Sequence, residues 1–265
     1  MIHDKRLVTR HGVPAIGMQI LKELIRSLKL DFPITAGVVG SHLIAVASRR
    51  LGLAARLPRT ENGEPVASER AMLTLVGNSA RHVAMWVLEE EWYRAGIGMA
   101  SLNSLLEIDY DTLQETNAKH IVASRSAGKN LMVVGHFPFV DRIRPTVRNL
   151  WIMEKKSGGD YISEEEGYQL LPEADVVAIT GSSLINHTFE RIMSHCSAGS
   201  FKIMLGPSTP LSPVLFDYGL DVIGGTLVET VDRVLADVQK GVAFRKLKGV
   251  RTVVMAKDSL GNPKS

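Results

Sequence analysis

The sequence is poor in the features that mark secreted and membrane-spanning proteins. Its 265 residues include a single cysteine, Cys196, so the chain cannot form an internal disulfide, and this fits a reducing cytoplasm. Residues 1–6 lead directly into polar sequence without the apolar core of a signal peptide. No apolar run approaches the roughly 20 residues that span a bilayer. We therefore expect a cytoplasmic protein that has no membrane partner.

Loops that usually cradle nucleotide phosphates are also missing. After the apolar run at residues 131–134, the spacing G-x-G-x-x-G is absent. Phe137 and Pro138 stand where the backbone would have to approach a pyrophosphate. A Walker-type loop is absent as well. NAD, FAD or ATP bound in the usual way is therefore not expected, and the sequence identifies no cofactor.

Charge of one sign is not concentrated anywhere. The 31 lysines and arginines face 28 acidic residues, which leaves a formal charge of +3. A nucleic-acid-binding protein gathers its basic residues in a patch with interleaved aromatic side chains. The nearest candidate is residues 240–251, where a solvated face is the better interpretation. We expect no nucleic-acid partner.

Ligands for a protein-bound metal are scarce. Closed zinc-type sites and soft-metal sites use several cysteine or histidine ligands, whereas this chain has no C-x-x-C motif and no histidine pair at i, i+4 spacing. Cys196 shares an apolar helical stripe with Phe189 and Ile192, which favours a core position. His187 and His195 lie about 12 Å apart along a helix, too far to share an ion, and read as surface residues. The sequence therefore predicts no metal site.

The first part of the chain contains both helical and β-type patterns. Apolar residues recur at helical spacing over residues 14–28. Turn-forming residues occupy positions 61–65. Three strands and then two helices, the latter separated by Gly96 and Gly98, are predicted at residues 34–39, 42–47, 53–57, 80–93 and 99–106. A small antiparallel sheet with helices is therefore expected, followed by a mixed polar crossing at residues 109–126.

The second part alternates strand and helix signals. Continuous apolar runs, typical of strands buried on both faces, lie at residues 131–134, 150–153, 175–180, 201–205 and 221–223. Helical patterns lie between and after them at residues 163–171, 184–196 and 227–240. Such alternation indicates a parallel sheet with helices on its faces. The predicted class is α/β, with a small α+β N-terminal domain (1–120), a Rossmann-like parallel-sheet domain (121–255) and a polar tail (256–265).

Polar, glycine-rich loops follow several of the predicted strands. Ligands of open parallel sheets bind beyond the carboxyl ends of the strands, and a helix N-terminus after such a loop favours an anion. For one of the two serines at 182–183, a simple helix N-cap is an equally good interpretation. The candidate ligand-binding residues are Gly135, Pro138, Glu154, Thr180, Gly181, Ser182, Ser183, Asn186, Gly206, Pro207, Ser208 and Thr209.

His136 is the candidate catalytic residue. It stands at the carboxyl end of the first parallel strand, where an imidazole is well placed to transfer a proton at neutral pH. The alternative is a structural side chain that holds its own loop by a hydrogen bond to the backbone. Nothing in the sequence decides between these roles.

Three motifs in order resemble one prokaryotic family of unknown function, that of the "putative heavy-metal chelation" domain. They are residues 129–138, 171–181 and 206–213, the last followed by Leu215, Phe216 and Gly219. Residues 98–103 and Gly40 resemble the N-terminal domain of the same family. The resemblance implies an enolase-N-terminal-like domain followed by a Rossmann-like domain, with a site in the cleft between them.

Two functions are compatible with these observations. The first is binding of a small anionic metabolite or metal complex in the interdomain cleft by an enzyme of metal or metal-cofactor metabolism. The second is a non-catalytic protein that sequesters such a ligand through the same loops. A homodimer is expected only because it is the commonest assembly of soluble proteins.

Overall fold

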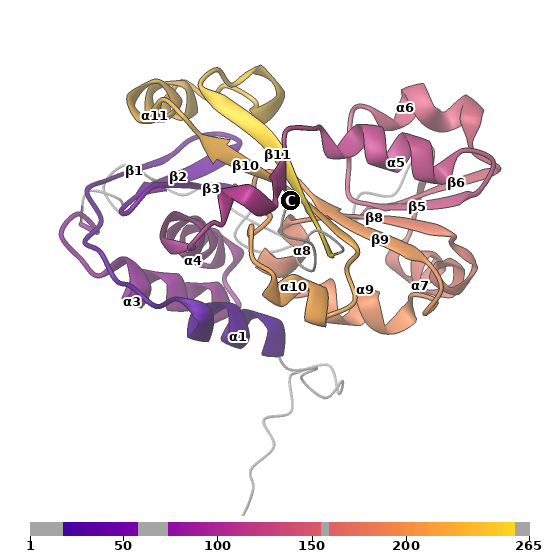
Figure 1. Cartoon of the computed structure of the whole chain (residues 1–265), viewed down its shortest axis with the longest axis horizontal. Coiled ribbons are helices and arrows are strands. Elements are labelled where there is room, and N and C mark those ends of the chain that lie inside the picture. The colour runs from indigo at the N-terminus through magenta and orange to yellow at the C-terminus, as the bar shows by residue number, and fades with distance from the viewer. Residues whose placement is uncertain (1–17, 58–73, 155–158, 258–265) are drawn as a thin grey trace, which may run out of the picture.

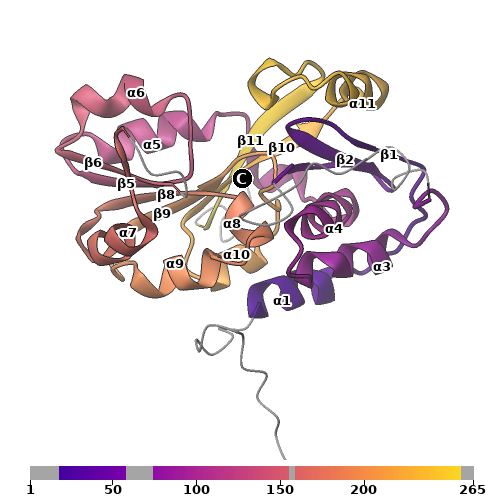
Figure 2. The ribbon, with the colours of Figure 1, turned by 180° about the vertical axis from the view of Figure 1, so that it is seen from behind.

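Two β-sheets organise the chain (Figures 1 and 2). The computed structural model describes residues 18–57, 74–154 and 159–257. The small sheet is antiparallel, with the order β1 (Ala36–Val39), β2 (Leu43–Ala47) and β3 (Leu51–Ala55). The large sheet has the order β4-β11-β10-β9-β8-β5-β6-β7 and is parallel from β10 to β7. The predicted α/β class, with a small α+β unit and a larger parallel sheet, is confirmed.

The large sheet has more strands than the five that the apolar runs predict. Its strands are β4 (Leu113–Gln114), β5 (Asn130–Val134), β6 (Asn149–Met153), β7 (Tyr161–Ile162), β8 (Val176–Thr180), β9 (Phe201–Leu205), β10 (Val222–Val228) and β11 (Val250–Ala256). The main addition is β11, which pairs antiparallel with β10 along its whole length. Because Leu227 and Val228 continue β10, the helix expected from residue 227 begins only at Val231.

Alternate residues of the central strands face opposite layers of helix. Leu131 and Val133 pack with α5 (Ala118–Ser126) and α6 (Val140–Ile143), whereas Met132 belongs to the core beneath α7 (Glu164–Leu170) and α9 (Phe189–His195). Figures 1 and 2 show these helices on the two sides of the sheet. Burial on both faces explains why the strands are continuously apolar.

Helix boundaries differ from the periodicity at three places. In place of the helix predicted at 80–93, the chain forms the short helix α3 (Ala80–Ala84) followed by a 3-10 turn. Helix α4 (Trp92–Leu105) then continues through Gly96 and Gly98 without a break. A Cβ at Gly98 would lie 2.2 Å from the Val87 backbone nitrogen, so this glycine serves close packing and does not end a helix. The helix predicted at 184–196 is divided into α8 (Ser182–Ile185) and α9, and the polar crossing contains α5.

The last helix of the second half returns to the small sheet. Helix α11 (Val231–Gln239) packs Val234 and Val238 against apolar residues of β2 and β3, and Figure 1 shows it above β1 and β2. On the other face, α4 packs against β2 and β3, while α1 (Gln19–Ser27) contacts α10 (Val214–Asp217). The small sheet is therefore enclosed by elements from both halves.

Some expectations fall outside the described residues. These are the start of the first helix at 14–17, the turn at 61–65 and the polar tail from residue 258. Within the described ranges, no helix combines the length and apolar character needed to cross a membrane.

Gly40 provides a test of the contact between α11 and the small sheet. A Cβ at this position would lie 2.0 Å from Val238 O, a backbone atom that cannot rotate away. We expect Gly40→Ala to lower the free energy of unfolding by about 1–3 kcal/mol through overpacking, measured by urea denaturation. Gly199→Ala, whose added Cβ would meet nothing within 4 Å, is the control and should change stability by less than about 0.5 kcal/mol. Equal effects of the two substitutions would contradict the packing described for α11.

Candidate functional site

A cavity of about 220 Å³ lies between the small sheet and the carboxyl edge of the large one, and we call it the inter-sheet cavity. Its wall comes from β3, the end of α4, the connection that follows α4, the loop after β9, and the adjoining ends of β10 and β11. Seven of the sixteen lining residues are leucine, isoleucine or valine. The polar and charged lining residues are Arg50, Asn103, Tyr110, Thr209, Thr226, Glu229 and Arg251.

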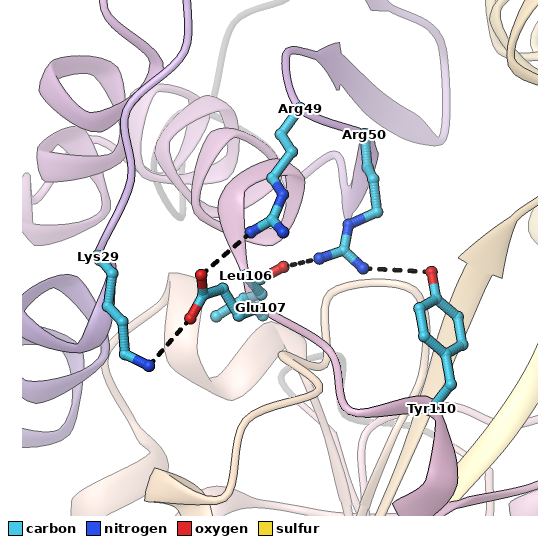
Figure 3. A network of polar contacts seen from close by, with 6 residues as sticks. All are labelled: Lys29, Arg49, Arg50, Leu106, Glu107 and Tyr110. Atoms are coloured by element: carbon cyan, nitrogen blue, oxygen red, sulfur yellow. Dashed lines mark hydrogen bonds and ion pairs between the residues drawn. The ribbon is translucent and has the colours of Figure 1, made fainter.

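Arg50 brings a guanidinium group to this cavity from the turn before β3. The group donates to Leu106 O and lies 3.4 Å from the Tyr110 hydroxyl (Figure 3). Its Nε is buried and has no hydrogen-bond partner among the described residues. The adjacent Arg49 instead pairs with Glu107 at 3.6 Å, outside the cavity wall. Arg50 thus retains an unused donor, which a carboxylate or phosphate oxygen would accept well.

Arg251 is a second guanidinium in the wall, at the start of β11. It pairs with Glu115 and, through Nε, lies 2.9 Å from Glu229 Oε1. The hydrogen bond that Arg251 donates to Glu115 and the negative charge of both carboxylates raise the pKa of Arg251 above its usual value. Of the two carboxylates, Glu229 lines the cavity and Glu115 does not. The cavity therefore presents charge of both signs.

The side-chain amide of Asn103 has a defined orientation. Its Nδ2 donates to Leu53 O at 2.9 Å and to Ser208 O at 3.4 Å. Both partners are acceptors, so the nitrogen must face them. Oδ1 is left buried without a partner in the described part of the chain. The cavity wall consequently contains an unused acceptor as well as the unused donor of Arg50.

The predicted site residues of the loop after β9 differ in their roles, since some line the cavity and one bonds to the small sheet. Pro207 and Thr209 line the cavity. Ser208 is only 1% exposed, and its Oγ accepts a hydrogen bond from Ala55 N at 2.8 Å, which joins the loop to β3. The Thr209 hydroxyl is buried and unpaired among the described residues. Gly206 has φ 119°, a conformation that permits the sharp turn out of β9.

The loops after β5, β8 and β9, which contain most of the predicted site residues, are neighbours in the structure. A Cβ at Gly135 would meet the Thr180 side chain at 2.9 Å, and one at Gly181 would meet Thr209 N at 2.6 Å. These close approaches run along the edge of the sheet from β5 through β8 to β9. The predicted loops at this edge therefore do come together.

Polar groups in and just after the loop that follows β8 form hydrogen bonds with one another. Ser183 Oγ donates to Thr180 O at 2.8 Å, and Ser182 N donates to Thr180 Oγ1 at 3.3 Å. Asn186 Oδ1 accepts from the backbone and the hydroxyl of Thr188. None of these predicted residues belongs to the wall of the inter-sheet cavity. Their hydrogen bonds stabilise the short helix α8 and its exit.

His136 lies in a different cavity, of about 150 Å³, near the carboxyl ends of β5 and β6. Its Nδ1 is 3.0 Å from the Tyr161 hydroxyl, and an Arg144–Asp160 ion pair of 2.8 Å lies in the same wall. Pro138 and Glu154, also predicted as ligand-binding, line neither cavity. The structure therefore separates His136 from Pro207 and Thr209.

His187 is not the surface residue that its helical position predicts. It has φ 60°, interrupts the helix between α8 and α9, and its Nε2 donates to Val87 O at 2.8 Å. Burial lowers the pKa of His187, against the smaller opposing effects of Val87 O and Glu90. This imidazole joins the first half of the chain to the second.

Cys196 is the one thiol that could bind a soft heavy metal. Cys196 packs against the core, and its thiol donates to Ile192 O at 3.3 Å. Burial raises the pKa of Cys196 to about 11, so the thiol is neutral at pH 7 and is a poor ligand. Throughout residues 18–57, 74–154 and 159–257, no group of three or more His, Cys, Asp or Glu side chains is arranged to hold a metal ion.

Sequence reasoning missed the charged and amide residues of the cavity. Arg50 lies in a turn, and Arg251 belongs to a strip interpreted as a solvated face. Asn103 ends the segment 98–103 that resembles the family's N-terminal domain. That resemblance was the one available signal, since no spacing rule joins residues so far apart in the chain.

Two family models match the chain, and both carry the description "Putative heavy-metal chelation". The DUF4213 model matches residues 21–106, and the DUF364 model matches residues 117–257. The second match alone covers more than half of the 265 residues.

Three similar proteins are described as uncharacterized or of unknown function. An uncharacterized protein of Methanocaldococcus jannaschii is 27% identical over 148 residues, which are 52% of this chain and 56% of that protein, so the match spans little more than half of its length. A DUF364 crystal structure from Desulfitobacterium hafniense is 25% identical, with TM-score 0.76, over 90% of this chain and 98% of that one. A second, from Pyrococcus horikoshii, has 17% identity, TM-score 0.74 and the same coverage, and shares the fold.

The two hydroxyls of the loop after β9 should differ in their contribution to stability. Ser208→Ala leaves the Ala55 N–H without its partner and should lower the free energy of unfolding by about 1–3 kcal/mol. Thr209→Val removes a buried hydroxyl that is unpaired in the described chain and should leave stability unchanged or raise it by about 1 kcal/mol. Urea denaturation of both variants measures this. An equal loss in both would show that the Thr209 hydroxyl also has a structural partner.

His187 should make stability depend on pH. The pKa of His187 is lowered in the folded chain, whereas in the unfolded chain it has its usual value of 6.5, so below that pH the unfolded chain binds the proton more readily. The contribution of His187 to the free energy of unfolding should therefore be complete above pH 6.5. Below that pH the free energy of unfolding should fall by up to about 1.4 kcal/mol per pH unit. His187→Asn, which tolerates the positive φ, should flatten this dependence in denaturation curves at pH 7.5 to about 5.5. The exposed His120→Gln is the control and should keep the wild-type slope.

Proposed function

This chain belongs to the DUF364 family, described as "Putative heavy-metal chelation", as its motifs implied, and we propose that it binds a small anionic metabolite or metal complex in the inter-sheet cavity. The observation that carries the proposal is the pair of guanidinium groups, Arg50 and Arg251, in the wall of one small cavity. Arginine is well suited to carboxylate and phosphate, because its planar group offers donors in a fixed geometry.

Arg50 is the proposed anchor for the anion. Arg251 is held by ion pairs to two carboxylates, whereas Arg50 forms no ion pair with a described residue. The buried Nε of Arg50 also lacks a hydrogen-bond partner among those residues. A buried donor without a partner is costly, and a ligand oxygen at Arg50 would remove that cost. The cavity volume of about 220 Å³ is below the roughly 300–1,000 Å³ of sites for drug-sized ligands, which supports a small metabolite.

Any metal carried by this protein is proposed to arrive already bound by the ligand. Soft heavy metals prefer thiolates, and the neutral, core-packed Cys196 does not fit that chemistry. The described chain adds no cluster of oxygen and nitrogen ligands. A small chelator whose free oxygens contact Arg50 would connect the family description with these side chains.

Non-catalytic binding is the form of this proposal that the geometry supports best. The candidate proton-transfer residue His136 lies with Tyr161 in the second cavity and is absent from the wall of the first. An enzyme acting on the same anion is the alternative, favoured by the His136–Tyr161 contact of 3.0 Å at the edge of the sheet. The alternative requires a substrate that extends from one cavity to the other, and turnover that His136→Ala abolishes.

Replacing Arg50 tests the proposed anchor. A panel of aliphatic carboxylates and inorganic phosphate is screened by thermal shift, since a ligand of the folded state raises Tm with concentration. For each probe that binds, Arg50→Met should weaken affinity by at least about tenfold in calorimetry, as expected for a lost charged hydrogen bond. Arg49→Met is the matched control because Arg49 pairs with Glu107 outside the cavity wall.

Two results would contradict the proposal. One is that no probe of either class binds the wild-type chain. The other is that Arg50→Met and Arg49→Met bind every probe equally well while both remain folded by circular dichroism. Arg50→Lys, which keeps the charge and loses the planar group, separates attraction to the charge from hydrogen bonding.

A further inference from the structure

The wall of the inter-sheet cavity is built for more than an anion. A ligand with acceptor oxygens alone would satisfy Arg50 and leave Asn103 Oδ1 buried without a donor. That oxygen cannot exchange places with Nδ2, because Nδ2 faces the carbonyl oxygens of Leu53 and Ser208. A ligand that also carries N–H or O–H groups would supply the donor that this oxygen lacks among the described residues.

Charge in the wall points in the same direction. Arg50 and Arg251 supply two positive charges and Glu229 supplies one negative charge, while Glu115 pairs with Arg251 from outside the wall. The cavity therefore offers charge of both signs. A ligand with separated positive and negative groups matches it, because each group finds an opposite charge.

The remaining lining is aliphatic. Leu51 and Leu53 of β3 face the cavity together with Leu106, Leu211 and Leu227 from the surrounding elements. Burial of an apolar group against such side chains is favourable by about 25 cal/mol per Å². The ligand therefore has an apolar part in addition to its charged ends.

We infer that the inter-sheet cavity binds a zwitterion of the aliphatic α-amino acid type, with its carboxylate at Arg50 and its ammonium group toward Glu229 and Asn103 Oδ1. This inference rests on the proposed function, in that the same cavity and the same Arg50 hold the acidic group. It adds the positive group, the residues that recognise it and the aliphatic side chain.

The test compares whole amino acids with analogues that lack one group. Calorimetry on the full chain uses leucine and valine, their deamino analogues isocaproate and isovalerate, and their decarboxy amines isoamylamine and isobutylamine. At least one amino acid should bind, and more tightly than either of its analogues by about tenfold or more. The full chain is used throughout.

Two variants locate recognition of the ammonium group. Glu229→Gln and Glu115→Gln each remove one carboxylate from Arg251, but only the first removes it from the cavity wall. Glu229→Gln should reduce the preference for the amino acid over its deamino analogue to within about twofold, while Glu115→Gln keeps it. Equal behaviour of the two variants would overturn the role given to Glu229.

Failure of this inference and failure of the proposed function give different results. If isocaproate or isovalerate binds as tightly as its amino acid and Arg50→Met weakens it, the zwitterion is overturned and the anion site stands. The same holds if neither amino acid binds and another carboxylate or phosphate does so through Arg50. If no probe binds, both are overturned.

Discussion

The structure depends on one hydrogen-bonded seam between its two sheets. Ser208, in the loop after β9, accepts from Ala55 N at the end of β3, and Asn103 of α4 donates to Leu53 O and toward Ser208 O. These contacts join the small sheet, its central helix and the carboxyl edge of the large sheet. The inter-sheet cavity exists because the seam holds these three elements together beside the ends of β10 and β11.

Close backbone approach occurs beside this seam and at other contacts of the fold. Gly40 lies against α11, Gly98 against the chain near Val87, and Gly181 against Thr209. Each of these positions leaves no room for a Cβ, so the elements pack more closely than side chains would allow. In the wall of the cavity, the buried Arg50 Nε and Asn103 Oδ1 have no hydrogen-bond partner among the described residues. The proposed ligand supplies those partners.

Local patterns predicted most of the central architecture. Apolar runs located β5, β6, β8 and β9, and the polar loops after them are neighbours, as Gly135, Thr180 and Gly181 show. Periodicity failed where tertiary contacts override it. Helix α4 passes through two glycines that read as a break, and the helical stripe before α9 is interrupted at His187, which turns to donate to Val87 O. Strand β11 was not predicted, because its first residues belong to the basic stretch 240–251, which was interpreted as a solvated face.

What the sequence alone determined was the α/β class, the family resemblance and which polar loops follow the parallel strands, because these follow from local periodicity and from motifs contiguous in the chain. Only the tertiary structure decided which polar groups share a cavity. It placed Ser208 in the seam and His136 in a separate cavity, and it brought Arg50, Asn103 and Arg251 into one wall. Those three residues come from a turn, a helix and the antiparallel strand β11, and their proximity depends on how the two sheets pack, which no local pattern encodes.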